Sequence, residues 1–166
     1  MISKEYNRVM VAIDGSKMAE LAFKKAVNIV KRNQGTLVIT HIIDTRSVML
    51  FPQYEPSVSQ TNFLEQSSQA ASRTVEAYKD WAEGNGVENV ETLIRNGSPR
   101  IEIAHTLSEE HDIDLIVLGA TGLSALERAF VGSVSQYVVQ NASCDVLIVR
   151  SESDEIDNTP IIDEDF

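Results

Sequence analysis

Three glycines stand in the stretch GATGLSALERAFVGSVSQ, which covers residues 119–136 and directly follows the apolar run Leu115 to Leu118. Glycine adopts backbone angles that are closed to other residues, and it lets a ligand approach the main chain. Gly132 precedes a predicted helix, whose free N–H groups and positive dipole end favour a bound anion. These residue types suit a phosphate site, although their spacing alone fits a simple turn and helix start equally well.

The elements that would position these glycines follow from the apolar pattern. Short apolar runs predict five strands at residues 8–13, 36–43, 90–97, 113–120 and 145–150. Helical spacing predicts helices at residues 18–32, 62–83 and 132–141, and Ser98-Pro99 opens a fourth as N-cap and first helical residue. Because strands and helices alternate, we predict an α/β fold, a doubly wound five-stranded parallel sheet in the order 3-2-1-4-5 with helices on both faces.

The pocket of such a sheet lies outside the carboxyl ends of its strands, where the strand order reverses. Three predicted strand ends carry suitable residues, namely Asp14-Gly15-Ser16, Ile42-Ile43-Asp44 and Gly119-Ala120-Thr121-Gly122. We therefore expect a pocket between the first and fourth strands. Gly119 and Gly122 would let a loop wrap a sugar and its phosphates, and Gly132 would open the helix that holds them.

Charge limits the classes of partner. The chain has 166 residues with 25 acidic and 14 basic side chains, and its last sixteen residues hold acids but no base. The remaining body is only weakly acidic and has no basic excess to attract a phosphate backbone, which argues against nucleic-acid binding. We expect residues 1–150 to form one domain. We expect residues 151–166 to form an acidic, disordered tail, with docking of Ile161, Ile162 and Phe166 as the alternative.

Other motifs that would indicate a different chemistry are missing from the sequence. The lone cysteine, Cys144, excludes an intramolecular disulfide, and we see neither a secretion signal nor an apolar run long enough for a membrane span. We therefore expect a cytoplasmic protein. There is no P-loop motif, no histidine pair with metal-ligand spacing and no nucleophile elbow. The long segment 44–61 could cover a ligand or the helix beside it.

The glycine pattern resembles the nucleotide motif of the universal stress protein family, in its ATP-binding type. The shared pattern is Gly119-x-x-Gly122, nine residues, and then Gly132-Ser133. The resemblance extends over roughly residues 5 to 150, through VAIDGS, THIID, NGSP, DLIVLGATG and CDVLIVR. It implies ATP, or AMP, as the ligand, together with Mg²⁺ or Mn²⁺ bound mainly through phosphate oxygens.

The resemblance also implies a role for individual positions. Asp14 and the main chain of Ala12 and Ile13 would contact the adenosine end, and the backbone of Ile42 would meet adenine. Gly119 and Thr121 would line the path of the ribose and phosphates, which Gly122 would approach closely. The positions implied to hold the β- and γ-phosphates are Gly132, Ser133, Val134 and Ser135.

The resemblance further implies a homodimer through the strand at residues 145–150, held by Val146, Ile148 and Val149. An unpaired apolar edge strand would otherwise be a liability.

The function expected from these features is a regulatory module of stress adaptation, whose nucleotide state sets its conformation or its unidentified protein partner. One alternative is a slow ATPase or an adenylate-forming enzyme, against which we note no carboxylate or histidine clearly placed to activate water. The other alternative is a nucleotide-independent dimeric scaffold, which would leave the glycines unexplained.

Overall fold

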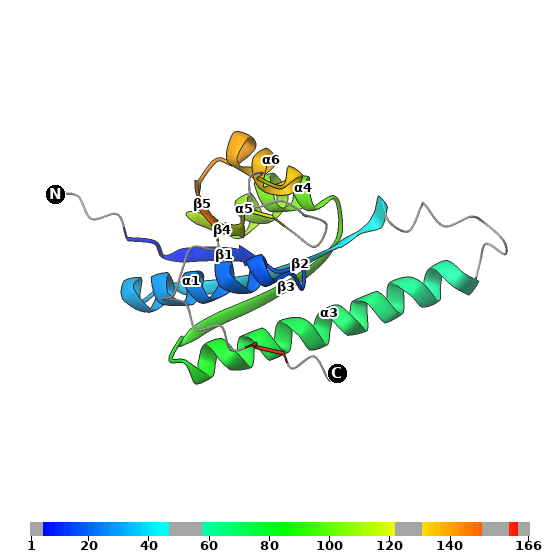
Figure 1. Cartoon of the computed structure of the whole chain (residues 1–166), viewed down its shortest axis with the longest axis horizontal. Coiled ribbons are helices and arrows are strands. Elements are labelled where there is room, and N and C mark those ends of the chain that lie inside the picture. The colour runs from blue at the N-terminus through cyan, green and yellow to red at the C-terminus, as the bar shows by residue number, and fades with distance from the viewer. Residues whose placement is uncertain (1–4, 47–57, 122–130, 151–159, 163–166) are drawn as a thin grey trace.

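The structure is a computed structural model that describes residues 5–46, 58–121, 131–150 and 160–162. Its centre is a five-stranded sheet in the order β3-β2-β1-β4-β5, and all four neighbouring pairs are parallel (Figure 1). The strands are β1 (Arg8–Ala12), β2 (Thr36–Asp44), β3 (Asn89–Gly97), β4 (Leu115–Gly119) and β5 (Asp145–Val149). The predicted fold class and strand order are confirmed.

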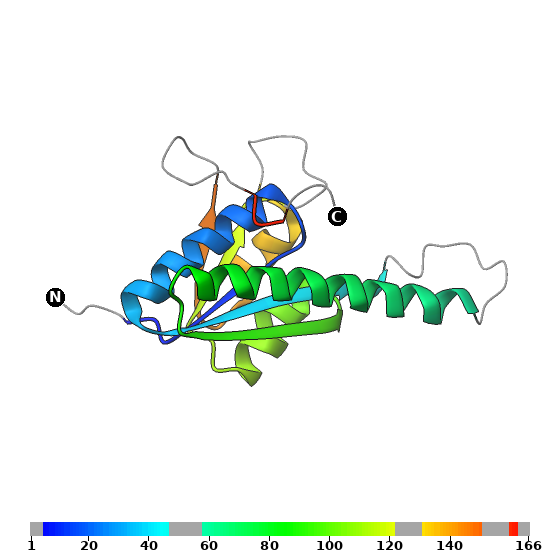
Figure 2. The ribbon, with the colours of Figure 1, turned by 90° about the horizontal axis from the view of Figure 1, so that it is seen from below.

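Helices cover both faces of this sheet (Figures 1 and 2). On one face lie α1 (Lys17–Asn33) and α3 (Val58–Gly84). On the other face lie α6 (Ser133–Asn141) and a helical segment made of α4 (Pro99–Ile101), the π-helix η1 (Glu102–Thr106) and α5 (Leu107–Glu110). Within the described ranges, no helix has both the length and the apolar character that a bilayer crossing requires.

The core is divided into two clusters because successive side chains of a strand point to opposite faces of the sheet. In β1, Val9 and Val11 belong to the first cluster, with residues of α1 and α3. Met10 belongs to the second cluster, with residues of η1 and α6. All three side chains are fully buried, so β1 is the apolar centre that both helical layers cover.

The strands differ in how far they reach toward the carboxyl edge of the sheet. The pairing of β1 with β2 ends at Ala12 and Thr40, whereas β2 stays paired with β3 as far as Asp44 and Gly97. The tip of the β2–β3 pair therefore runs past the end of β1. This overhang leaves one side of the β2 tip without a neighbouring strand, directly beside the place where the strand order reverses.

The structure differs from the sequence prediction in the bounds of α3. This helix begins at Val58, inside the segment that we had expected to be a loop as far as Thr61. Residues 47–57, with the apolar side chains that could have covered a ligand, lie outside the described residues. Pro99 does open a helix after Ser98, but the Ser98 side chain makes no capping hydrogen bond.

The C-terminal segment is described only at Pro160–Ile162. Ile161 and Ile162 are half-buried and pack against the first cluster, which Met18 and Trp81 also contact. These contacts match the docked alternative at two of its three residues, and Phe166 lies outside the described residues.

Candidate functional site

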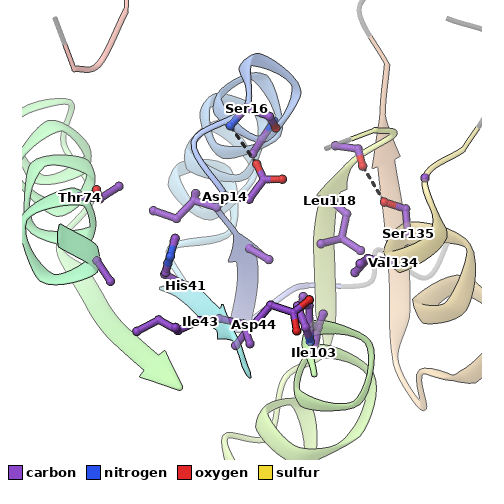
Figure 3. Close-up of a pocket in the computed structure, with 18 of the residues that line it drawn as sticks. Asp14, Ser16, His41, Ile43, Asp44, Thr74, Ile103, Leu118, Val134 and Ser135 are labelled. Carbon is purple, nitrogen blue, oxygen red and sulfur yellow. Dashed lines mark hydrogen bonds between the residues drawn. The ribbon is translucent and has the colours of Figure 1, made fainter. Parts of the chain in front are cut away.

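A cavity of about 800 Å³ opens at the carboxyl ends of β1, β2 and β4. It extends from α3 on one side to α6 on the other, across the ends of the central strands (Figure 3). Its lining includes ten of the eleven positions expected to bind nucleotide, namely Ala12, Ile13, Asp14, Ile42, Gly119, Thr121, Gly132, Ser133, Val134 and Ser135. The eleventh, Gly122, lies outside the described residues. The structure thus brings positions from four separate segments together, while their roles remain predictions.

Asp14 is held at the exit of β1 by the turn that follows it. Gly15 has a φ of +80°, in the left-handed region that favours glycine. The turn brings the Ser16 N–H to 2.9 Å from Asp14 Oδ1, to which it donates, and the Ser16 hydroxyl accepts from the Ala19 N–H as the N-cap of α1. The Asp14-Gly15-Ser16 sequence therefore both starts α1 and fixes a carboxylate in the wall of the cavity (Figure 3).

Gly119 has a packing role in addition to the expected ligand role. A Cβ atom at this position would lie 2.7 Å from the backbone carbonyl carbon of Met18, at the start of α1. Because backbone cannot give way as a flexible side chain can, any larger residue would push α1 away from β4. The glycine is therefore required by close contact inside the protein, whatever binds in the cavity.

The exit of β4 is tied to the start of α6 by two hydrogen bonds. The Gly132 N–H donates to the Ala120 carbonyl at 2.6 Å, and the buried Ser135 hydroxyl donates to the Gly119 carbonyl at 2.8 Å (Figure 3). Ser135 is one of the positions implied to hold the β- and γ-phosphates. In the structure its proton serves Gly119 instead, so this side chain fixes the glycine segment against α6.

The N-terminus of α6 keeps main-chain donors for a ligand. The first bond of the helix runs from the Gln136 N–H to the Gly132 carbonyl at 2.9 Å. The N–H groups of Ser133, Val134 and Ser135 precede it and so have no acceptor within the helix ladder. All three residues line the cavity, and the nine-residue helix places its positive dipole end there.

The charges around the cavity are mostly negative. Its described lining contains the carboxylates of Asp14 and Asp44 and no lysine or arginine. Asp44 forms an ion pair with Arg46 at 2.6 Å, which holds the pKa of Asp44 below its usual value. Within the described part of the chain, no group of three histidine, cysteine or acidic side chains could hold a metal ion. Among the described lining residues, an anion would find its donors in main-chain N–H groups and side-chain hydroxyls rather than in basic side chains.

His41 also lines the cavity, and it is not among the positions that we expected to bind nucleotide. Its half-buried ring points from β2 into the space between Asp14 and Thr74 (Figure 3). Burial lowers the pKa of His41, against the opposing effects of a hydrogen bond with the backbone of Ile13 and the charge of Asp14. Sequence reasoning could have noticed a polar side chain near the carboxyl end of an otherwise apolar strand.

Comparison with known proteins identifies related chains. Residues 5–150 match the universal stress protein family, which leaves the C-terminal segment outside the match. A putative universal stress protein of Staphylococcus haemolyticus (strain JCSC1435) is 42% identical over 147 residues, which cover 89% of this chain and 86% of that one. A putative universal stress protein of Staphylococcus aureus (strain USA300) is 41% identical over 155 residues, covering 93% and 90%.

Solved structures show the same fold. Universal stress protein UspA from Lactobacillus plantarum matches with a TM-score of 0.77 at 30% identity, over 89% of this chain and 100% of that one. A universal stress protein in complex with cAMP matches with a TM-score of 0.65 at 26% identity, over 90% and 100%.

Proposed function

Because this chain belongs to the universal stress protein family, we propose that it is an ATP-binding member of the family, a regulatory module whose nucleotide state sets its conformation or its partners. The observation that carries the proposal is the cavity that gathers the expected positions from β1, β2, β4 and α6. The related protein in complex with cAMP supports an adenine nucleotide as the ligand. ATP and AMP are both candidates for the working ligand.

The overhang of β2 supports adenine as the base. The Thr40 carbonyl accepts from the Ile13 N–H at 2.9 Å, so Thr40 turns its main chain toward β1. Alternate residues of a strand turn their main-chain groups the same way. Ile42 therefore presents its N–H and C=O beyond the end of β1, where no strand pairs with it in the described sheet. A carbonyl next to an N–H complements the amino group and ring nitrogen of adenine, whereas guanine carries an oxygen where adenine has the amino group.

The N-terminus of α6 supports the proposal that the same ligand carries phosphates. Free main-chain N–H groups at a helix N-terminus are a general anion site. Because the described lining lacks basic side chains, most of the phosphate charge would be neutralised by Mg²⁺ or Mn²⁺ bound to the phosphate oxygens. ATP binding should therefore depend strongly on the divalent ion.

We propose that two copies assemble through β5. This strand is one edge of the sheet, and its residues Val146 and Ile148 are half-buried against the second cluster. Val149 was also expected in the interface, but it is buried in the first cluster of its own chain. Pairing would therefore use the main chain of β5 together with Val146 and Ile148.

Calorimetry on nucleotide-free protein tests the proposed function. We expect ATP with Mg²⁺ to bind, GTP to bind more weakly, and EDTA to weaken the binding of ATP. Ligand at a hundredfold excess over Kd stabilises the folded state by about 2.7 kcal/mol, which corresponds to a rise in Tm of roughly 5 to 10 °C for a domain of this size. Failure of ATP to bind would reject the proposal and leave the dimeric scaffold. Turnover above about one per second, near ordinary enzyme values, would favour the enzyme alternative.

A further inference from the structure

The edge of the sheet opposite β5 is formed by β3, which pairs with β2 alone in the described sheet. Figure 2 shows this strand along the rim of the sheet, beside α3. None of its nine residues is fully buried, whereas β2 has four consecutive buried residues. A long edge strand presents unpaired main-chain groups to any other strand that can match them. Because no residue of β3 lines the cavity, this edge is a surface distinct from the proposed nucleotide site.

The register of the sheet shows which main-chain groups of β3 face outward. In β2, the Thr40 carbonyl accepts from the Ile13 N–H, so Thr40 faces β1 and the adjacent residue Ile39 faces β3. Ile39 lies opposite Thr92, and a residue that faces a parallel neighbour bonds to the two residues that flank its partner. Thr92 itself therefore turns its N–H and C=O away from β2. The alternate residues that face outward in the same way are Val90, Ile94 and Asn96.

The side chains along this edge carry charge in a symmetrical pattern. Glu91, Leu93 and Arg95 share one face of β3, because alternate residues of a strand point the same way. The two charged side chains are 44% and 46% exposed, and they flank Leu93, which packs against the second cluster. Glu91 forms an ion pair with Arg8 at 2.7 Å, and Arg95 forms one with Glu110 at 3.0 Å. Each charge is thus held at the edge by a partner in its own chain.

We propose that β3 pairs antiparallel with β3 of a second copy of this chain, about a twofold axis at Leu93. This axis places Thr92 opposite the partner's Ile94, and Val90 opposite the partner's Asn96. All four residues face outward, so each of these pairs can exchange both of its main-chain hydrogen bonds. The side chain of Leu93 would meet its own copy at the axis.

The charges select this register over its neighbours. Glu91 lies opposite the partner's Arg95, in a pair without main-chain hydrogen bonds, where side chains approach most closely. An axis one residue away leaves neither charge opposite the other, and an axis two residues away places like charges opposite each other. The network at the Leu93 axis alternates in sign, from Arg8 through Glu91 to the partner's Arg95 and the partner's Glu110. Exposed ion pairs contribute most when several charges form such a network.

Sedimentation equilibrium of the full chain tests this pairing with two substitutions of Thr92. All proteins carry Ile148→Lys, which opposes the proposed pairing of β5. Thr92→Pro removes an outward N–H and keeps the bonds to β2, because proline is tolerated in an edge strand where the N–H faces solvent. Thr92→Val keeps the N–H and is the control. A single pair of strands forms a small interface, so we expect association at roughly 100 µM and above. Thr92→Pro should weaken it about tenfold or more, and Thr92→Val should change it little.

A mixing experiment tests the register. Arg95→Glu and Glu91→Arg each place like charges opposite each other, so either variant alone should associate about tenfold more weakly. In an equimolar mixture, each charge of one variant meets the opposite charge of the other, so the association should be recovered. Circular dichroism and Tm show whether each variant is folded, since both lose an ion pair within the chain. If Glu91→Arg does not fold, Arg95→Glu and the two Thr92 variants still decide.

Three results would overturn the inference. The first is a protein with Ile148→Lys that stays monomeric throughout this concentration range. The second is equal association of Thr92→Pro and Thr92→Val, which would assign self-association to another surface. The third is a mixture that associates no more tightly than its separate components, which would exclude the axis at Leu93. The proposed nucleotide function is tested separately by calorimetry with ATP and does not depend on these results.

Discussion

A single main-chain hydrogen can be removed from the proposed phosphate site by the substitution Ser133→Pro. Ser133 is the first residue of α6, where proline is favoured because its N–H has no helical partner to lose. A proline also requires an extended residue before it, and Gly132 already has φ −62° and ψ 157°. The side chain of Ser133 is exposed, so the new ring does not enter the core. The substitution should therefore delete one donor and preserve the helix.

The expected loss follows from the charge of the acceptor. A hydrogen bond to a charged group contributes about 1.5–3 kcal/mol, which corresponds to about a 10- to 150-fold increase in Kd. The control is Ser133→Ala, which removes the hydroxyl and keeps the N–H. We expect Ser133→Ala to bind ATP with Mg²⁺ nearly as well as the wild type. Titration calorimetry measures both Kd values, and circular dichroism and Tm show whether the helix is intact.

The comparison of the two variants would refute the phosphate assignment in a specific way. If Ser133→Pro folds normally and binds ATP as tightly as Ser133→Ala, the α6 N–H does not contact the ligand. Equal and large losses in both variants would instead assign the contact to the hydroxyl. AMP, which lacks the β- and γ-phosphates, should be much less sensitive to Ser133→Pro than ATP.

Two further predictions concern the tail and the assembly. Deletion of residues 151–166 should lower Tm by roughly 3 to 8 °C, because it exposes the surface that Ile161 and Ile162 half-bury. The double substitution of Ile161 and Ile162 by serine should reproduce this loss, and an unchanged Tm in differential scanning calorimetry would support a disordered, dispensable tail. Ile148→Lys should convert the proposed dimer to monomers in sedimentation velocity, since a charge on the β5 edge opposes pairing. Exposed Val139→Lys on α6 is the matched control, and a dimer that survives Ile148→Lys would exclude this interface.

The sheet could be predicted because its determinants are local. Val9 and Val11 alternate with Met10 in a strand that is buried on both faces, and glycine or proline marks the ends of several elements. Regular alternation of strands and helices then restricts the connections to right-handed crossovers. The start of α3 at Val58 could not be predicted in this way, because the preceding segment has no clear periodicity.

The positions in the site could be predicted better than their contacts. Gly119 and Ser135 were found as members of a motif, but their distances to Met18 and to each other depend on how α1 and α6 pack on the sheet. His41 was missed for a related reason. Whether its ring meets a helix or a cavity depends on how far β2 runs past β1, and that register is a property of the folded sheet.

The overhang of β2 and β3 leaves one strand edge of the described sheet without a paired strand. Beyond Ala12 and Thr40, this tip is a two-stranded ribbon in which the β1 side of Ile42 is open. A two-stranded ribbon is marginal by itself, so its amides should exchange with solvent faster than those at the centre of the sheet. A flat base that bonds to Ile42 would occupy the place of a third strand. The rate of hydrogen exchange at the Ile42 amide would then fall when the site is occupied. The ligand would act as a removable part of the sheet.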